Sequence, residues 1–134
     1  MTIAIDTNVR VRLLVRDDEA QYASAQRLVD AAAAAEEPML IVLGALLETE
    51  WVLRSHYKLD KASIACAFTA LMESADVEFE HPPTVEEALF VWAQDPETDF
   101  ADCLLTARAA HLGRGRFLTL DAGAARLPGV ESLA

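Results

Sequence analysis

The sequence predicts an α/β domain in which a central parallel sheet of four or five strands lies between two layers of helices. Short apolar runs rich in β-branched residues alternate with segments of helical periodicity, which is typical of parallel sheets covered on both faces. The chain has 134 residues, enough for one domain with its own core. Hydrophobic residues make up 53%, which excludes a disordered acidic chain. We therefore expect a single domain over residues 1–134.

The expected elements alternate along the whole chain. Strands are predicted at residues 2–6, 39–42, 77–80, 116–121 and 129–133. Helices are predicted at residues 18–34, 43–57, 60–74, 84–94 and 99–112. Glu36, Glu37 and Pro38 follow an alanine run and predict a helix end and a turn, and Gly113 suits a helix C-terminus. The runs 2–6 and 116–121 are largely apolar, as expected of central strands buried on both faces.

The charge balance is strongly acidic, with 22 Asp and Glu against 11 Lys and Arg and a formal net charge of -11. A net anion repels phosphate, which disfavours a protein that grips DNA by a broad basic face. A local groove lined by cations, or a site where metal ions invert the local charge, remains compatible with this balance.

The cysteines and the apolar runs indicate a reducing compartment. Cys66 and Cys103 lie in apolar-periodic stretches, so we expect buried, reduced thiols and no disulfide. The N-terminus lacks the pattern of a signal peptide, and the longest apolar run, about residues 40–47, is far shorter than the roughly 20 residues of a membrane span. The expected location is the cytoplasm, with no membrane association.

Two acids stand where predicted strands end. Asp6 ends the first strand, and Asp121 ends the strand at 116–121. Ligands of open parallel sheets gather at the carboxyl ends of the strands, and an unpaired carboxylate there would be costly to bury. We expect the two acids to face each other or to share a cation. Taken singly, each has the alternative interpretation of a helix N-cap.

The middle helix carries two glutamates with different expected roles. Glu48 and Glu50 are roughly 200° apart around a helix, so they cannot both point into one cluster. Glu50 stands four residues before Arg54, which suits a structural ion pair. Glu48 has no cation three or four residues away and shares its face with Trp51. We therefore assign the functional role to Glu48.

Two more acids lie at the start of the helix at 99–112. Asp99 and Asp102 are three residues apart on one face. Asp99 has the alternative of an N-cap, and Asp102 that of an acid answering the helix dipole. Asp102 also sits beside apolar residues on a helix that is expected to be buried, and a metal ion would explain its place.

Together, Asp6, Glu48, Asp102 and Asp121 would place four negative charges at one site. Without a counter-charge, their repulsion would raise their pKa values and strain the fold. A set of carboxylate oxygens suits Mg²⁺ or Mn²⁺, which pair naturally with phosphate substrates. A divalent cation there would activate water and orient a phosphodiester.

Four motifs in this order resemble those of the PIN-domain nucleases. They are IDTN at 5–8, LLETEWVL at 46–53, DFADCLL at 99–105 and TLD at 119–121. The length and the sequence WVLRSHY after the middle acid are most similar to the VapC-type toxins of bacterial toxin–antitoxin pairs. The resemblance extends from residue 3 to about residue 126 and implies a PIN-like three-layer fold.

The resemblance also implies function. Family members cleave RNA with Mg²⁺ or Mn²⁺, form dimers and are neutralised by a small VapB-type antitoxin. The four catalytic and metal-binding acids of the family match Asp6, Glu48, Asp102 and Asp121. Asp99 matches an additional metal-binding acid found in part of the family, and Asn8 and Thr119 match its small supporting polar residues.

Because the chain is acidic, RNA binding would rest on metal ions and on local arginines. The candidates are Arg10, Arg12, Arg16 and Arg54, which follow Asp6 or Glu48 closely. The alternative for each arginine is a place on a solvated helix face. If they bind RNA, affinity should fall steeply with salt.

Two other classes of function stay open. IDTNV faintly resembles the nucleophile motif of haloacid-dehalogenase-type phosphatases, although Asn8 replaces the second acid, and receiver domains also combine an α/β sheet with Mg²⁺. The other alternative is a PIN-like scaffold that binds RNA or a protein without cleaving it. Asp6→Asn would abolish cleavage and preserve binding only in a nuclease.

Overall fold

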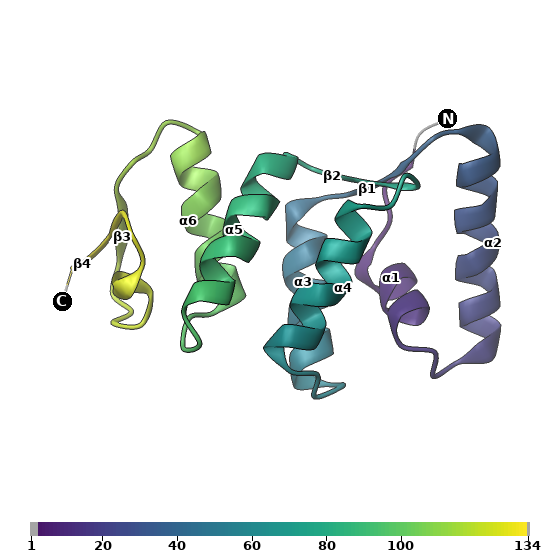
Figure 1. Ribbon diagram of the computed structural model, residues 1–134, viewed down its shortest axis with the longest axis horizontal. Helices are drawn as coiled ribbons and strands as arrows, with labels where there is room; N and C mark the ends of the chain where they lie inside the picture. Colours follow the sequence, from purple (N-terminus) through teal and green to yellow (C-terminus); the bar gives the residue numbers. More distant parts are fainter. Residues whose placement is uncertain (1–2, 134) are drawn as a thin grey trace. The chain divides into compact units, whose positions relative to one another are not determined.

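The computed structural model describes residues 3–133, which belong to two units, Met1–Glu80 (unit 1) and His81–Ala134 (unit 2). Unit 1 contains, in chain order, α1 (Thr7–Leu14), α2 (Glu19–Ala35), β1 (Met39–Ile41), α3 (Leu43–Ser55), α4 (Lys61–Met72) and β2 (Val77–Phe79) (Figure 1). Unit 2 contains α5 (Pro82–Gln94), α6 (Phe100–His111), β3 (Phe117–Thr119), the 3-10 helix η1 (Ala124–Arg126) and β4 (Val130–Ser132). The single domain over 1–134 stays a prediction.

The sheet of unit 1 is parallel. β1 pairs with β2 in the register Met39 with Val77 and Ile41 with Phe79. The chain before α1 pairs with the other edge of β1 through a parallel bridge between Ala4 and Leu40. The predicted strand at 2–6 is thus seen as an extended segment with a single bridge, and residues 1–2 lie outside the described residues.

Aspartate caps determine where several helices of unit 1 begin. A side-chain oxygen of the residue before the helix accepts a hydrogen bond from a backbone N–H of the first turn, which satisfies a donor that the helix leaves unpaired. This holds for Asp6 before α1, Asp18 before α2 and Asp60 before α4. At the other end, α2 stops at Glu36, so the predicted helix end is confirmed; the left-handed φ of 55° at Glu36 was not predicted.

The core of unit 1 is formed where the helices cover the strands. Its side chains come from the strands, from α1, and from the inner faces of α3 and α4. The largest that are fully buried are Met39, Leu46, Leu53, Ile64 and Phe68. This packing fixes α1 and α3 against the strands. α1 begins directly after Asp6, and α3 carries Glu48.

Unit 2 is built on the pair α5 and α6. Trp92 of α5 meets Phe100 of α6 edge to face, with ring centroids 5.0 Å apart. After α6, Gly113 has a φ of +84°, the left-handed conformation expected of this helix end. β3 then pairs with β4 in parallel, Phe117 with Val130 and Thr119 with Ser132.

The predicted central sheet of four or five strands is not observed among the described residues. The strands form two parallel pairs, one in each unit, flanked by helices. The alternation of strands and helices agrees with the predicted α/β class. β3 differs from the expected central strand, because Leu118 is 50% and Leu120 75% exposed. In unit 2 its ladder partner is β4, and the exposure of Leu118 means that the face of β3 that carries this side chain is not covered.

Both cysteines are free thiols, as expected, but only Cys103 is buried. Cys66 is exposed, which corrects the prediction of two buried thiols. α4 turns Ile64 and Phe68 into the core, and Cys66 lies between them in sequence on another face. None of the helices within residues 3–133 meets the length and hydropathy that a bilayer-crossing segment requires.

Candidate metal centre

Asp6 joins the extended segment beside β1 to the first turn of α1. Its Oδ1 accepts a hydrogen bond from the backbone N–H of Asn8 at 2.8 Å. The helix cap that the sequence left open for Asp6 is therefore present. The cap uses one carboxylate oxygen, and Asp6 is exposed, so its second oxygen can meet a further partner from solvent.

The two glutamates of α3 have separate environments, as the helical spacing predicted. Glu50 is 4% exposed, and its Oε2 lies 2.8 Å from Nε of Arg54. This ion pair confirms the structural role inferred for Glu50. Glu48 is exposed, and none of the hydrogen bonds or ion pairs among residues 3–133 involves its side chain. It is a carboxylate open to a ligand, and its metal-binding role stays a prediction.

The acids of unit 2 lie at the start of α6 and after β3. Asp99 occupies the N-cap position of α6, but its side chain makes no cap hydrogen bond. Asp102 follows in the first turn. Asp121 is held by its loop: its N–H donates to Oγ1 of Thr119 at 3.0 Å, and its Oδ1 accepts from the N–H of Gly123 at 2.9 Å. Thr119 thus supports the backbone that carries the acid.

Three of the predicted acids act on one another. Burial, and then the negative charges of Asp99 and Asp121, raise the pKa of the Asp102 carboxyl above its ordinary value. None of these contributions comes from a cation of the described chain. Unit 2 therefore brings Asp99, Asp102 and Asp121 close enough for their charges to interact, in a place where the ionised form of Asp102 is disfavoured.

The carboxylates are not gathered into a ligand shell. Within residues 3–133, no group of three or more His, Cys, Asp or Glu side chains is arranged so that it could hold a metal ion. Mutual repulsion favours such spacing between unscreened carboxylates. Asp6 and Glu48 belong to unit 1 and the other acids to unit 2, so a site shared by all of them stays a prediction.

An arginine that the sequence analysis did not select connects the two acidic loops of unit 2. Nη2 of Arg126 lies 3.0 Å from Oδ2 of Asp95, and its Nη1 lies 2.8 Å from Oε2 of Glu97. Asp95 and Glu97 precede Asp99, whereas Arg126 ends η1, which follows Asp121. These ion pairs tether the loop after β3 to the loop before α6. The only sequence signal was a lone cation five residues after Asp121.

The arginines proposed to contact RNA are all engaged within unit 1 or buried there. Arg10 is 7% exposed, and its Nε and Nη1 are buried without a hydrogen-bond partner. Burial lowers its pKa, and the charge of Asp76 opposes that shift. Because Arg10 is turned away from solvent, the structure favours the other three candidates as surface contacts.

Those three candidates each have an acidic neighbour. Arg12 lies 2.8 Å from Asp17, and Arg54 pairs with Glu50. Arg16 lies 3.0 Å from Glu19, with its guanidinium 4.1 Å from the ring centre of Tyr22. The pair of Arg16 with Glu19 is exposed, and such pairs contribute only about 0–1 kcal/mol, so a phosphate can compete for this arginine. Arg12 and Arg54 are held more firmly, because Arg12 is half-buried beside Asp17 and Glu50 is buried. Their contact with RNA stays a prediction.

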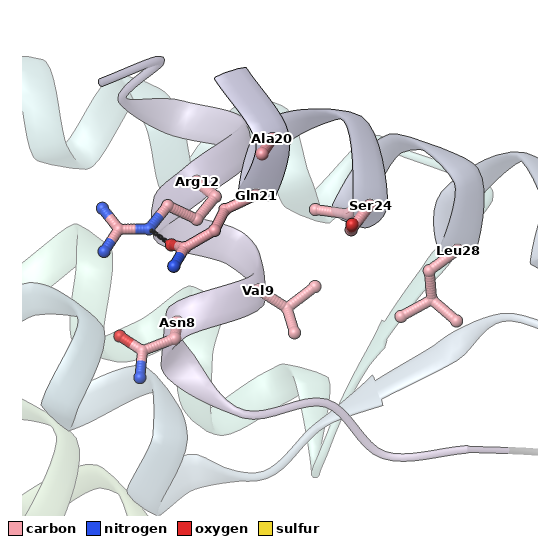
Figure 2. Close-up of a pocket in the computed structure, with 8 residues that line it drawn as sticks. Asn8, Val9, Arg12, Ala20, Gln21, Ser24 and Leu28 are labelled. Carbon is pink, nitrogen blue, oxygen red and sulfur yellow. Dashed lines mark hydrogen bonds between the residues drawn. The ribbon is translucent and has the colours of Figure 1, made fainter. Parts of the chain in front are cut away.

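An open cavity of about 540 Å³ lies between α1 and α2 within unit 1. Figure 2 shows Asn8, Val9 and Arg12 of α1 facing Gln21, Ser24 and Leu28 of α2, with Arg12 hydrogen-bonded to Gln21. Its lining is mixed, with the apolar side chains of Val9, Ala25 and Leu28 beside the polar ones of Asn8, Gln21 and Ser24. It therefore suits a ligand that is partly apolar, and its volume lies in the range of ligand sites.

The family model of the PIN domain matches residues 3–130, almost the whole chain. The chain belongs to the PIN-domain family. No curated protein matches the chain at significant similarity. PIN domains have an α/β fold, are typically metal-dependent nucleases and usually use Mg²⁺ or Mn²⁺. The family assignment confirms the resemblance to PIN-domain nucleases that the four acidic motifs carried.

Proposed function

We propose that this PIN domain is an endoribonuclease toxin of the VapC type, which cleaves RNA with Mg²⁺ or Mn²⁺ and is inhibited by a small antitoxin protein. The observation that carries the proposal is the environment of Asp102. A protein gains nothing in stability from a partly buried carboxylate repelled by Asp99 and Asp121, so such a group is a candidate for function. Membership of a nuclease family agrees with this interpretation.

The residues present suit a hard divalent cation. Asp6, Glu48, Asp102 and Asp121 would hold it, with Asp99 assisting, and every donor is a carboxylate oxygen, the ligand that Mg²⁺ and Mn²⁺ prefer. The cation would supply activated water and charge stabilisation at the phosphate.

The chain's own residues have defined tasks in this proposal. The cap from Asn8 orients Asp6 so that one oxygen stays fixed and the other faces solvent. Thr119 and Gly123 hold Asp121 through the backbone and side chain. Such hydrogen bonds reduce the freedom that each carboxylate would lose on binding the cation and the phosphate.

The test is cleavage of a pool of structured RNAs by the purified chain. We expect cleavage with Mg²⁺ or Mn²⁺, none with EDTA, and a loss of more than about 100-fold in Asp102→Asn. Glu86→Gln is the matched control, because it removes one exposed negative charge from the same unit. Cleavage that persists in EDTA, or in Asp102→Asn, would rule out the proposed chemistry.

A PIN-like module that binds RNA without cleaving it is the second candidate. It is favoured by the absence, within residues 3–133, of a ready metal-binding group. The variant Asp6→Asn separates the two functions. In a nuclease it abolishes cleavage and preserves RNA binding, whereas in a silent module wild type and variant both bind and neither cleaves.

The antitoxin and dimer partners are part of the same proposal. The cavity between α1 and α2 has the mixed lining that suits an apolar segment of a small protein. α2, α3 and α4, the apolar helices of unit 1, would supply the rest of the groove and the dimer face. Light scattering of the purified chain tests the dimer: we expect twice the 14.6 kDa mass of one chain, and a monomer would contradict it.

A further inference from the structure

A second cavity of unit 1 shares Asn8 and Arg12 with the first. It has a volume of about 510 Å³, within the range of ligand sites, and lies between α1 and the C-terminal half of α3. Asn8, Val11 and Arg12 of α1 line one side of it. Trp51, Val52 and Ser55 of α3, with His56 and Tyr57 directly after α3, line the other. It combines aromatic, guanidinium, imidazole and amide groups.

Trp51 is the unusual member of this wall. It is 58% exposed, whereas the other tryptophan, Trp92, is 2% exposed and packed against Phe100. None of the ring contacts within residues 3–133 involves Trp51. A large aromatic face left in a cavity and open to solvent is a surface on which a flat ligand can stack.

The polar side of the cavity is held rigidly. Arg12 donates through Nη1 to Oδ1 of Asp17 and to the hydroxyl of Tyr57, both at 2.8 Å, and that hydroxyl donates to Oδ2 of Asp17 at 2.7 Å. The ring of His56 meets Tyr57 edge to face at 4.8 Å. Because Asp17 balances the charge of Arg12, the cavity is suited to a neutral planar group with polar edges more than to a phosphate.

The cavity adjoins the two candidate metal ligands of unit 1. Asn8 lines it and also donates its backbone N–H to Asp6. Trp51 follows Glu48 by three residues on α3, a spacing that places the two side chains about 5–6 Å apart at Cβ. A nucleotide whose phosphate is bound by the divalent cation proposed at Asp6 and Glu48 would thus have its base within reach of Trp51.

We propose that this cavity is a nucleobase subsite, in which an unpaired RNA base stacks on Trp51 while Asn8, Arg12 and His56 face its polar edges. The proposal deepens the proposed function and rests on its claim that the chain binds RNA. Unpaired bases are recognised by stacking on aromatic and guanidinium planes together with hydrogen bonds to their edges. The subsite would select single-stranded positions next to the cleaved bond.

The two tryptophans make the test direct. Because Trp92 is buried, quenching of tryptophan fluorescence by an added oligonucleotide reports on Trp51. Short oligouridine and oligoadenosine are titrated with Ca²⁺ in place of Mg²⁺, and an abasic oligomer of equal length supplies the same phosphates without bases. We expect saturable quenching by the RNAs and none by the abasic oligomer.

Variants assign the effect to the ring. Trp51→Ala should weaken binding of labelled RNA by about 5- to 150-fold, the range expected for one stacked base. Trp51→Phe should retain most of the affinity, and Phe90→Ala should be unaffected although Phe90 is 67% exposed. Equal binding by wild type and Trp51→Ala, or equal binding of abasic and normal oligomers, would overturn the subsite.

Cleavage in Mg²⁺ is measured on the same variants. RNA that is cleaved with no effect of Trp51→Ala on binding contradicts the subsite and leaves the nuclease in place. Quenching by RNA without any cleavage supports the nucleobase subsite and contradicts the proposed nuclease activity. A Trp51 surface that serves a protein partner instead would show no change in fluorescence with any oligonucleotide.

Discussion

Replacing Asp102 with asparagine should stabilise the metal-free protein while destroying its response to divalent cations. In the folded chain, burial and the charges of Asp99 and Asp121 raise the pKa of Asp102. A raised pKa means that folding favours the protonated acid, so this contribution to stability is present below the unfolded pKa and is lost as pH rises through the folded pKa. At neutral pH the ionised Asp102 carboxylate therefore lowers the stability of the folded chain, and asparagine removes this charge.

The two charged neighbours set a lower bound on the stabilisation by asparagine, because relief of the burial of the charge adds to it. Like charges three or four residues apart on a helix cost about 0.3–0.5 kcal/mol, which applies to Asp99 and Asp102. Asp121 adds a second repulsion of the same order. Relief of both gives about 0.5–1 kcal/mol, or a rise in Tm of about 2–5 °C for a chain of this length. The gain should vanish at about pH 3, where the carboxyl is protonated in both states.

The assay is thermal unfolding at pH 7, first in EDTA and then in Mn²⁺. Mn²⁺ at 100 times its dissociation constant would stabilise wild type by about 2.7 kcal/mol, and Asp102→Asn by much less. The order of the two Tm values should therefore reverse when the metal is added. Glu86→Gln, which removes an exposed charge from α5, should shift neither curve appreciably. If Asp102→Asn lowers Tm in EDTA, the carboxylate is a structural group and the reasoning is refuted.

Two further predictions concern residues around the site. Arg126→Ala should weaken Mn²⁺ binding by about 10-fold, because it releases the tether between the acidic loops. The control is Arg116→Ala, which breaks another exposed ion pair of unit 2 and should leave Mn²⁺ binding unchanged. Calorimetric titration compares the two variants, and equal affinities for Mn²⁺ would contradict a positioning role of Arg126. Glu50→Gln should lower the free energy of unfolding by about 1–2 kcal/mol and leave Mn²⁺ binding unchanged, because Glu50 is buried against Arg54. Glu48→Gln should do the reverse, with weaker Mn²⁺ binding and stability within about 0.5 kcal/mol of wild type by urea denaturation; matching effects of the two glutamates would contradict their separate roles.

Much of the secondary structure could be predicted because its signals are local. The end of α2 is indicated by Glu36, Glu37 and Pro38, and the end of α6 is indicated by Gly113. The separate environments of Glu48 and Glu50 follow from helical spacing and from Arg54, the cation four residues after Glu50. Such signals depend on neighbours within one or two helical turns, which a sequence displays directly.

What could not be predicted depends on contacts between distant residues. The tether from Arg126 to Asp95 and Glu97 joins residues about 30 positions apart, and no periodicity reveals it. The same holds for the exposure of Leu118, which depends on whether distant residues pack over its face of β3. Asp6 shows a third case: its sequence fits both a cap and a ligand, and the cap hydrogen bond alone does not exclude the second role.

The most direct test of the central claim is the position of manganese in a crystal of the chain soaked with Mn²⁺, located by anomalous scattering. We expect a peak about 2.0–2.2 Å from carboxylate oxygens of Asp102 and Asp121, with Asp6 and Glu48 completing the same site. A crystal without such a peak, or one in which packed hydrocarbon separates Asp6 from Asp102, would contradict the assignment of this PIN domain as a metal-dependent ribonuclease.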